Sequence, residues 1–200
     1  MYIIGILGGV ASGKSLVSGY FAELGAGVLD ADRAGHEVLD EGDVRRQAVE
    51  FWGEEILDRR GRIDRRRLAD IVFADGGEAA SEREKLEKLT HPRIRRRLLQ
   101  QAEELEKSGK RAIVLDAPLL LEAGWDKLCE AFVFVEAPRE QRLARATARG
   151  WSQEDVAARE SSQMSLEQKR RRADWVIDNS GTPRETREQV VAVWRRMFGG

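Results

Sequence analysis

The stretch Gly8–Ser15, with the sequence GGVASGKS, constrains the fold more than any other part of the chain. It has the spacing Gly-x-x-x-x-Gly-Lys-Ser and follows directly after the apolar run Tyr2–Leu7. Glycines at these positions let successive backbone N–H groups turn inward and form a nest for an anion. The helix expected over Ser15–Leu24 directs the positive end of its dipole at the same anion. The stretch therefore predicts a phosphate-binding loop between a strand and a helix.

Two side chains of this loop have direct chemical roles in such a site. Lys14 is expected to reach the β- and γ-phosphates of a nucleotide, and the Ser15 hydroxyl to ligate Mg²⁺. The other nucleotide contacts expected from the loop and the following turn come from Gly9, Val10, Ala11, Ser12, Gly13 and Leu16. The chain should therefore bind a nucleoside triphosphate together with Mg²⁺.

Four further short apolar runs predict β-strands, separated by longer helical patterns. The runs are Gly27–Asp30, Ala112–Asp116, Ala131–Glu136 and Trp175–Asn179. Most are almost continuously apolar, which is typical of a parallel sheet covered on both faces. Residues 32–110 contain much helix and little strand, so we expect a helical lobe inserted between the second and third strands. Overall the pattern predicts an α/β fold.

Helix starts are marked by capping chemistry. Ser152, Ser165 and Thr182 each stand three residues before an acid or amide, which is the pattern of a capping box. Because Pro183 suits a first helical position, a C-terminal helix is expected from Pro183 to about Met197. Apolar residues at helical spacing predict another helix over Pro92–Lys107.

Composition narrows the class of protein. The chain has 200 residues with 42% hydrophobic and 34% charged side chains, and its net charge is −1. The single cysteine, Cys129, rules out an internal disulfide. No apolar run approaches the roughly 20 residues of a membrane helix, and the apolar start lacks the basic flank of a signal peptide. We therefore expect a cytoplasmic protein without a membrane partner.

Arginine and lysine cluster at Arg62–Arg67, Arg93–Arg97 and Lys169–Arg172. One interpretation is solvated helix faces balanced by acidic neighbours, and the other is contact with an anionic ligand. Nucleic-acid binding is disfavoured because the chain has neither net positive charge nor aromatic residues interleaved with the basic ones.

Asp32 distinguishes a kinase from a GTPase switch. The sequence DRAG at Asp32–Gly35 matches a metal-contacting Asp-x-x-Gly, but it leaves little room for a switch segment, and no Asn-Lys-x-Asp occurs. At the carboxyl end of a parallel strand, Asp32 would instead face the ligand crevice and accept the proton of an acceptor hydroxyl. The alternative role is a helix N-cap, and one residue can serve both.

Asp116 and a set of arginines supply the other parts that a kinase needs. Asp116 ends an apolar strand as a Walker-B carboxylate does and would bind Mg²⁺ directly or through water; a turn residue before Ala117 is the equal alternative. Arg139, Arg142, Arg145 and Arg149 share one helix face, and we expect one or two of them to reach the transferred phosphoryl group from a lid.

These motifs resemble those of the dephospho-coenzyme A kinase family. The similar segments occur in the family's order and span nearly the full length: GILGGVASGKS, LGAGVLDAD, THPRI, DAPLLLE, the arginine segment, RESSQ and ADWVIDNSG. The resemblance implies a three-layer α/β P-loop kinase of the nucleoside-monophosphate-kinase type, with a five-stranded parallel sheet, an inserted helical acceptor lobe and a helical lid. It implies one kinase unit with its core at about 1–31, 111–137 and 173–200, the lobe at about 32–110 and the lid at about 138–172.

The resemblance also implies a reaction and its residues. The γ-phosphate of ATP, with Mg²⁺, passes to the ribose 3′-hydroxyl of dephospho-CoA, giving ADP and coenzyme A. The implied catalytic residues are Asp32, Lys14 and Arg145. Arg142, Asn179 and Gly181 join the loop in binding nucleotide, and Ser15 and Asp116 hold the metal. The acceptor-binding residues are Asp32, His91, Pro92, Ile94 and Leu119.

Two positions depart from the family's pattern. Ala11 stands where glycine is common, and Leu16 stands where threonine is common. We expect these changes to alter nucleotide affinity and to leave activity intact. A kinase for another small acceptor and a nucleotide-binding regulator remain alternatives, and the sequence does not indicate an oligomeric state.

Overall fold

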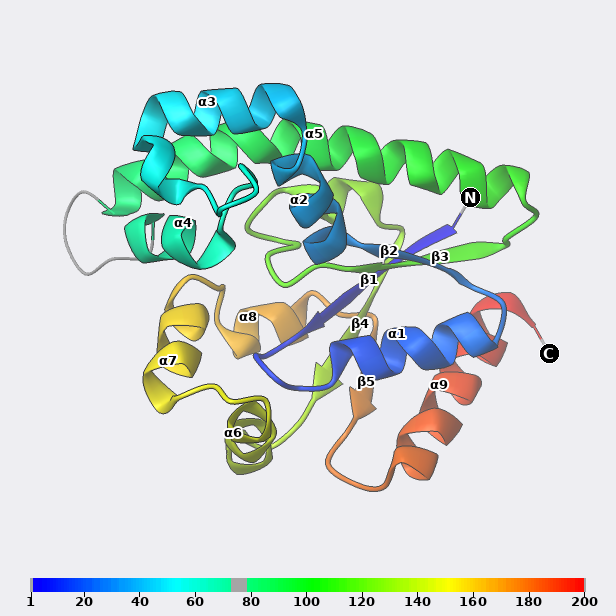
Figure 1. Ribbon diagram of the computed structural model, residues 1–200. Helices are drawn as coiled ribbons and strands as arrows, with labels where there is room; N and C mark the ends of the chain where they lie inside the picture. Colours follow the sequence, from blue (N-terminus) through cyan, green and yellow to red (C-terminus); the bar gives the residue numbers. More distant parts are fainter. Residues whose placement is uncertain (1, 73–78, 200) are drawn as a thin grey trace. The chain divides into compact units, whose positions relative to one another are not determined.

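The computed structural model describes residues 2–72 and 79–199 of the chain. Five strands form a parallel sheet in the order β2-β3-β1-β4-β5 (Figure 1). They are β1 (Tyr2–Gly8), β2 (Gly27–Asp30), β3 (Ala112–Asp116), β4 (Ala131–Glu136) and β5 (Trp175–Asp178). The predicted α/β fold with a five-stranded parallel sheet is confirmed, and the strand bounds differ from the prediction by one residue at most.

By compactness the chain divides into two units, residues 1–31 with 101–200, and residues 32–100. The first unit contains the sheet and the helices α1 (Lys14–Glu23), η2 (Trp125–Leu128), α6 (Arg139–Ala148), α7 (Gln153–Ser161), α8 (Leu166–Arg171) and α9 (Pro183–Phe198). The helices that make up most of the second unit are α2 (Ala31–Leu39), α3 (Gly42–Trp52), η1 (Glu54–Ile56), α4 (Arg65–Val72) and the larger part of α5 (Ala79–Lys107).

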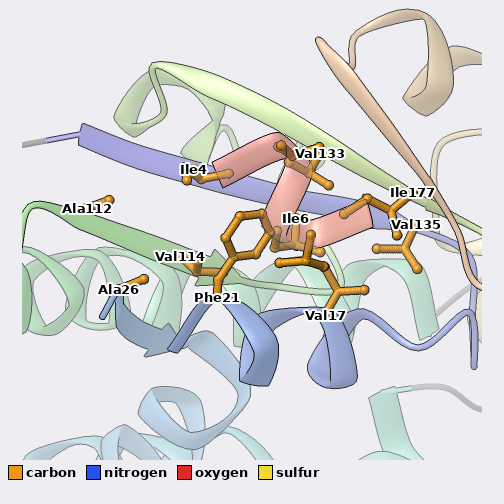
Figure 2. Close-up of a cluster of buried hydrophobic side chains, with 12 residues drawn as sticks. Ile4, Ile6, Val17, Phe21, Ala26, Ala112, Val114, Val133, Val135 and Ile177 are labelled. Carbon is orange, nitrogen blue, oxygen red and sulfur yellow. The ribbon is translucent and has the colours of Figure 1, made fainter. Parts of the chain in front are cut away.

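One face of the sheet is covered by α1 and α9. Ile4 and Ile6 alternate along β1 and therefore point to the same side, where they pack with Val17 and Phe21 of α1 (Figure 2). Val190 of α9 belongs to the same cluster and is fully buried. Each such large side chain stabilises the fold by about 1.5–3 kcal/mol through its removal from water. This packing fixes α1, and with it the loop that precedes α1, against the sheet.

The carboxyl ends of all five strands meet at one edge of the sheet because the strands are parallel. Gly8 ends β1 there, and the neighbouring strand β3 ends at Asp116. In the register of β2 with β3, Asp30 lies opposite Asp116. The edge therefore gathers the glycine loop and two carboxylates on three adjacent strands, which is the usual position of a ligand site in an open α/β sheet.

The helical unit is held by both apolar and ionic contacts of its own. Val38, Val44, Ile56, Leu68 and Leu98 are almost completely buried. The α5 guanidinium groups of Arg93 and Arg97 pair with carboxylates of Asp43 and Glu37 at 2.9 and 2.6 Å. These contacts tie α5 to α2 and α3 within this unit.

The three predicted capping boxes, at Ser152, Ser165 and Thr182, are all confirmed at the starts of α7, α8 and α9. The helix predicted to begin at Pro92 is longer than expected, because α5 begins at Ala79 and contains Pro92 in its interior. A proline inside a helix removes one hydrogen bond and crowds the preceding turn, yet α5 continues through Pro92 over its 29 residues. Among the described residues, no helix is long and apolar enough to cross a membrane.

Candidate active site

The phosphate loop joins the end of β1 to the start of α1. The Ser12 N–H donates to the Gly9 carbonyl at 3.2 Å and closes a turn. Gly13 has a φ of +101°, and a Cβ at this position would lie 2.1 Å from Nδ2 of Asn179, so both conformation and space require glycine. In the part of the chain that the structure describes, no side chain caps α1, and its first turn contains no acid. The N–H groups of this turn are thus suited to an anionic ligand.

Lys14, the first residue of α1, folds back over the loop. Its Nζ donates to the carbonyl oxygens of Gly9 at 3.0 Å and of Gly8 at 3.4 Å. The ammonium group therefore lies at the start of the loop, and its contact with the β- and γ-phosphates stays a prediction.

Asp116 and Ser15, the two predicted metal ligands, lie together at the sheet edge. Burial raises the pKa of the Asp116 carboxyl, while a hydrogen bond from the Ser15 side chain and the charge of Lys14 oppose this rise. The neighbouring Asp30 raises the pKa further, and Ser18 Oγ donates to Asp116 Oδ2 at 3.4 Å. A carboxylate that is costly to ionise in the free protein would gain from a nearby cation.

No group of three or more His, Cys, Asp and Glu side chains within residues 2–72 and 79–199 could hold a metal ion. A site made of one carboxylate and one hydroxyl fits Mg²⁺, which is usually held by one or two protein groups together with phosphate oxygens and water. It does not resemble a zinc site built from protein ligands alone.

Of the four arginines predicted to act from a lid, three lie on α6 and Arg149 is its C-cap residue, and two of the four contact the phosphate loop. Arg145 donates to the Ser12 carbonyl at 3.2 Å and to the Asn179 carbonyl at 2.7 Å. Arg142 is 5% exposed and donates both to the Val10 carbonyl at 3.2 Å and to Glu160 Oε1 at 2.5 Å. Arg139 and Arg149 are exposed. The structure thus separates a pair that touches the loop from a pair on the surface.

Asn179 supports the loop from β5. Its Nδ2 donates to the Ser12 carbonyl at 2.7 Å, and its Oδ1 accepts from the Thr186 hydroxyl at 2.9 Å. Both ends of the amide are thus engaged inside the protein, and the backbone carbonyl of Asn179 accepts from Arg145, so this residue holds the loop in place.

A cavity of about 270 Å³ opens beside this part of the loop. Its lining includes four predicted nucleotide residues and Arg149, and consists of Gly13, Leu16, Arg145, Arg149, Asn179, Gly181 and Pro183. Leu16 is 40% exposed here, so its side chain offers an apolar surface where a threonine would offer a hydroxyl. Sequence reasoning treated Pro183 only as a helix start and did not predict its place in this lining.

The predicted acceptor-side residues have different environments. Asp32 lies exposed in the first turn of α2, and Pro92 is exposed on α5. His91 is half-buried, and burial lowers its pKa against the opposing charge of Glu87. Ile94 is 7% exposed and belongs to the interior of the helical unit. Leu119 lies half-buried in the turn after β3, in the other unit.

The basic clusters differ in how far they are neutralised within the protein. In the Lys169–Arg172 cluster every cation has a carboxylate partner: Glu122, Glu136, Glu167 and Asp126 in turn. For this cluster the interpretation as a balanced helix face holds. Sequence reasoning did not anticipate that Lys169 would be buried, and no local signal distinguishes it from its neighbours.

Comparison with known proteins decides the family. The model of the dephospho-CoA kinase family matches residues 2–185. The chain belongs to the dephospho-CoA kinase family. A dephospho-CoA kinase of Symbiobacterium thermophilum is 43% identical over 202 residues, covering 100% of this chain and 83% of that protein. Enzymes of this family have dephospho-CoA kinase activity and catalyse the final step of coenzyme A biosynthesis.

Solved structures agree with this placement. The crystal structure of TT1252 from Thermus thermophilus matches with a TM-score of 0.85 and 36% identity, covering 100% of this chain and 98% of that one. The dephospho-CoA kinase from Campylobacter jejuni matches with a TM-score of 0.66 and 28% identity, covering 99% and 98%. The predicted family and enzyme class are therefore confirmed, and ATP is the family's co-substrate.

Proposed function

We propose that this chain transfers the γ-phosphate of ATP to the ribose 3′-hydroxyl of dephospho-CoA, with Asp32 as general base. Asp32 accepts the proton of the 3′-hydroxyl, the oxygen forms a bond to the γ-phosphorus, and the bond to the β,γ-bridging oxygen breaks. The products are ADP and a 3′-phosphorylated acceptor, coenzyme A. Lys14 and Arg145 balance the negative charge that spreads over the transferred group.

The observation that carries the proposal is the grouping at the sheet edge. Asp30 lies opposite Asp116, and the Asp116 carboxyl interacts with Ser15 and Lys14 of the phosphate loop. Asp32 follows Asp30 by two residues, so its Cα lies within about 7.6 Å of the Asp30 Cα, two steps of about 3.8 Å. Chain connectivity alone therefore supports the position of a general base next to the phosphate site.

Magnesium is part of this proposal. Ser15 and Asp116 would hold it, and the ion would neutralise charge on the β- and γ-phosphates. The raised pKa of Asp116 supports this role, because a carboxyl that burial disfavours as an anion is stabilised by a bound cation. Residues of about 138–172 would act as the lid, and residues of about 32–110 as the acceptor lobe.

Steady-state kinetics with Mg-ATP and dephospho-CoA test the assigned roles. Asp32→Asn should lower kcat by about 10²–10⁴-fold with little change in the KM for ATP, because the amide cannot accept the proton. Lys14→Ala should lower kcat by at least about a hundredfold, since the charge on the transferred phosphoryl loses its partner. Arg46→Ala, an exposed arginine elsewhere on α3, is the control and should match wild type. Full activity of Asp32→Asn would refute the general-base assignment.

A cavity of about 650 Å³ within the helical unit offers space for the acceptor, and its lining contains none of the five predicted acceptor-binding residues. His36 of α2 and Asp40, which directly follows α2, line it about one and two helical turns after Asp32. Arg65 and Arg66 line it as well, and the ion pairs recorded for this segment of the described chain involve Arg62 and Arg67 instead. An acceptor whose 3′-hydroxyl meets Asp32 would extend its diphosphate along α2 toward these cations.

Arg65→Ala and Arg66→Ala test this part of the proposal. Each should raise the KM for dephospho-CoA about tenfold through the loss of a charge-assisted hydrogen bond, while the KM for ATP stays the same. Arg93 and Arg97 are poorer candidates for the diphosphate because they already pair with Asp43 and Glu37. An unchanged acceptor KM in both variants would assign the diphosphate elsewhere.

A further inference from the structure

Lys169 is a buried cation that the reaction chemistry does not use. Its side chain is 2% exposed, and its Nζ lies 3.1 Å from Glu122 Oε1. The same ammonium group donates to Gln163 Oε1 at 3.0 Å and to the Pro118 carbonyl at 3.5 Å. Three acceptors thus surround the three donors of one ammonium group, with no access to water.

These partners belong to two different segments. Pro118 and Glu122 lie in the turn that leaves β3 directly after Asp116, the proposed metal-side carboxylate. Gln163 lies between α7 and α8, in the proposed lid (Figure 1). Met164 adds a second link, because its N–H donates to Glu122 Oε1 at 2.6 Å. The ammonium group of Lys169 therefore joins the lid to the turn after β3.

The contacts continue from the lid to the phosphate loop. The Gln163 N–H donates to the Glu160 carbonyl at 3.1 Å, and the Glu160 carboxylate accepts from Arg142 at 2.5 Å. Arg142 in turn donates to the Val10 carbonyl at 3.2 Å. Polar contacts thus link the turn after β3, through Lys169, Gln163 and Glu160 of the proposed lid, to the loop that would hold the phosphates.

Burial makes this ion pair unlike the others of α8. Arg171 and Glu167 pair on the same helix with side chains 76% and 73% exposed, a type of contact that contributes little to stability. A buried pair is also a poor source of stability compared with apolar side chains of equal volume, because both charges lose their hydration. A buried ammonium group with all three donors hydrogen-bonded instead fixes the arrangement of the groups around it.

We propose that Lys169 is a positioning residue for phosphoryl transfer: through Glu122 and Gln163 it fixes the lid relative to the turn after β3. This inference rests on the proposed function, because the segments it aligns are those that would carry Asp116, Leu119 and the lid arginines. Misplacement of reacting groups by about 1 Å can cost about a hundredfold in rate, so loss of this anchor lowers kcat. Nucleotide binding by the loop itself stays intact.

The test compares Glu122→Gln, Lys169→Met and the double variant with wild type. Each variant should show kcat reduced at least about tenfold, with the KM for ATP within about twofold of wild type. Either single variant leaves one buried charge without its partner and should melt at a lower temperature. The double variant removes both charges and should regain most of the melting temperature, yet remain slow. Arg171→Ala, which breaks the exposed pair, is the control and should match wild type in both measurements.

The outcomes separate a positioning role from a merely structural one. If the double variant regains kcat together with its melting temperature, or if Glu122→Gln keeps full kcat, the inference is wrong. Glu122→Gln decides the matter alone if Lys169→Met does not fold, because it keeps the shape of a side chain that is 20% exposed. Wild type without activity toward dephospho-CoA would instead refute the proposed function, so the two failures are distinguishable.

Discussion

Ala11 takes a backbone conformation that glycine adopts at lower cost. Its φ is +56°, and it is the one non-glycine residue of the described chain with positive φ. The left-handed conformation costs an L-residue about 1–2 kcal/mol. Its methyl group is buried in a cluster with Val10, Ala146 of α6 and Val156 of α7, which returns roughly 0.8 kcal/mol. The departure from the family's glycine is thus partly offset by packing between the loop and the helices α6 and α7.

Asp116 gives a pH-dependent prediction at the residue scale. Burial raises its pKa above 3.8 in the folded protein, so the folded state keeps a proton that the unfolded state has lost. Stability of the ligand-free protein should therefore fall as the pH rises from 3.8 through the folded pKa of this group, and the loss persists above it. Asp116→Asn removes this ionisation, so the variant should melt at a higher temperature than wild type at pH 7.

Melting temperatures of both proteins between pH 4 and pH 7 check this sign. The difference should grow with pH, and Mg-ATP-dependent activity of Asp116→Asn should be lower. A variant that melts below wild type at neutral pH would mean that the charged carboxylate stabilises the free protein.

At the scale of elements, the capping box at the start of the C-terminal helix α9 allows a test of how much a helix cap contributes to stability. Thr182 accepts from the Glu185 N–H, and Glu185 Oε2 accepts from the Thr182 N–H, which completes the capping box. Thr182→Ala should destabilise the protein by about 1 kcal/mol, or about 2–4 °C in melting temperature. Thr147→Ala, on the exposed side of α6, is the matched control and should cause no such loss.

The strands, the helix caps and the phosphate loop could be predicted from the sequence, because each depends on the residue types within a short segment. The start of α5 was predicted wrongly at Pro92, because the apolar residues at helical spacing that predicted the helix were followed only from that residue, and Pro92 does not end the long helix. The engagement of Asn179 with the Ser12 carbonyl joins residues 167 positions apart. Contacts of that kind depend on the sheet order and have no local pattern.

Dependence on tertiary packing also explains why the sequence did not indicate the contacts of individual arginines and lysines. The arginines of α6 were expected to act from a lid, and which of the four touch the loop depends on the packing of Val10 and Ala11 against α6 and α7. Lys169 and Arg170 look alike in the sequence, yet one is buried and the other is exposed. The clusters of charged residues in the sequence therefore indicated that ion pairs would form. They did not indicate which cation would be buried.

At the scale of the whole molecule, the sheet unit and the helical unit carry complementary parts of the proposed reaction. The sheet unit contains the phosphate loop, Asp116 and the arginines Arg142 and Arg145, and the helical unit contains Asp32 and the 650 Å³ cavity lined by Arg65 and Arg66. The net charge of −1 is thus compatible with anionic substrates, because cations are concentrated at particular positions within each unit.

The most direct measurement identifies the product. Purified protein is incubated with Mg-ATP and dephospho-CoA, and the products of wild type and Asp32→Asn are compared by mass spectrometry and phosphorus NMR. We predict ADP and an acceptor carrying one new phosphate on the ribose 3′-oxygen from wild type, and a large loss of both in Asp32→Asn. Formation of ADP with unmodified dephospho-CoA, or a phosphate at any other position, would contradict the proposed function.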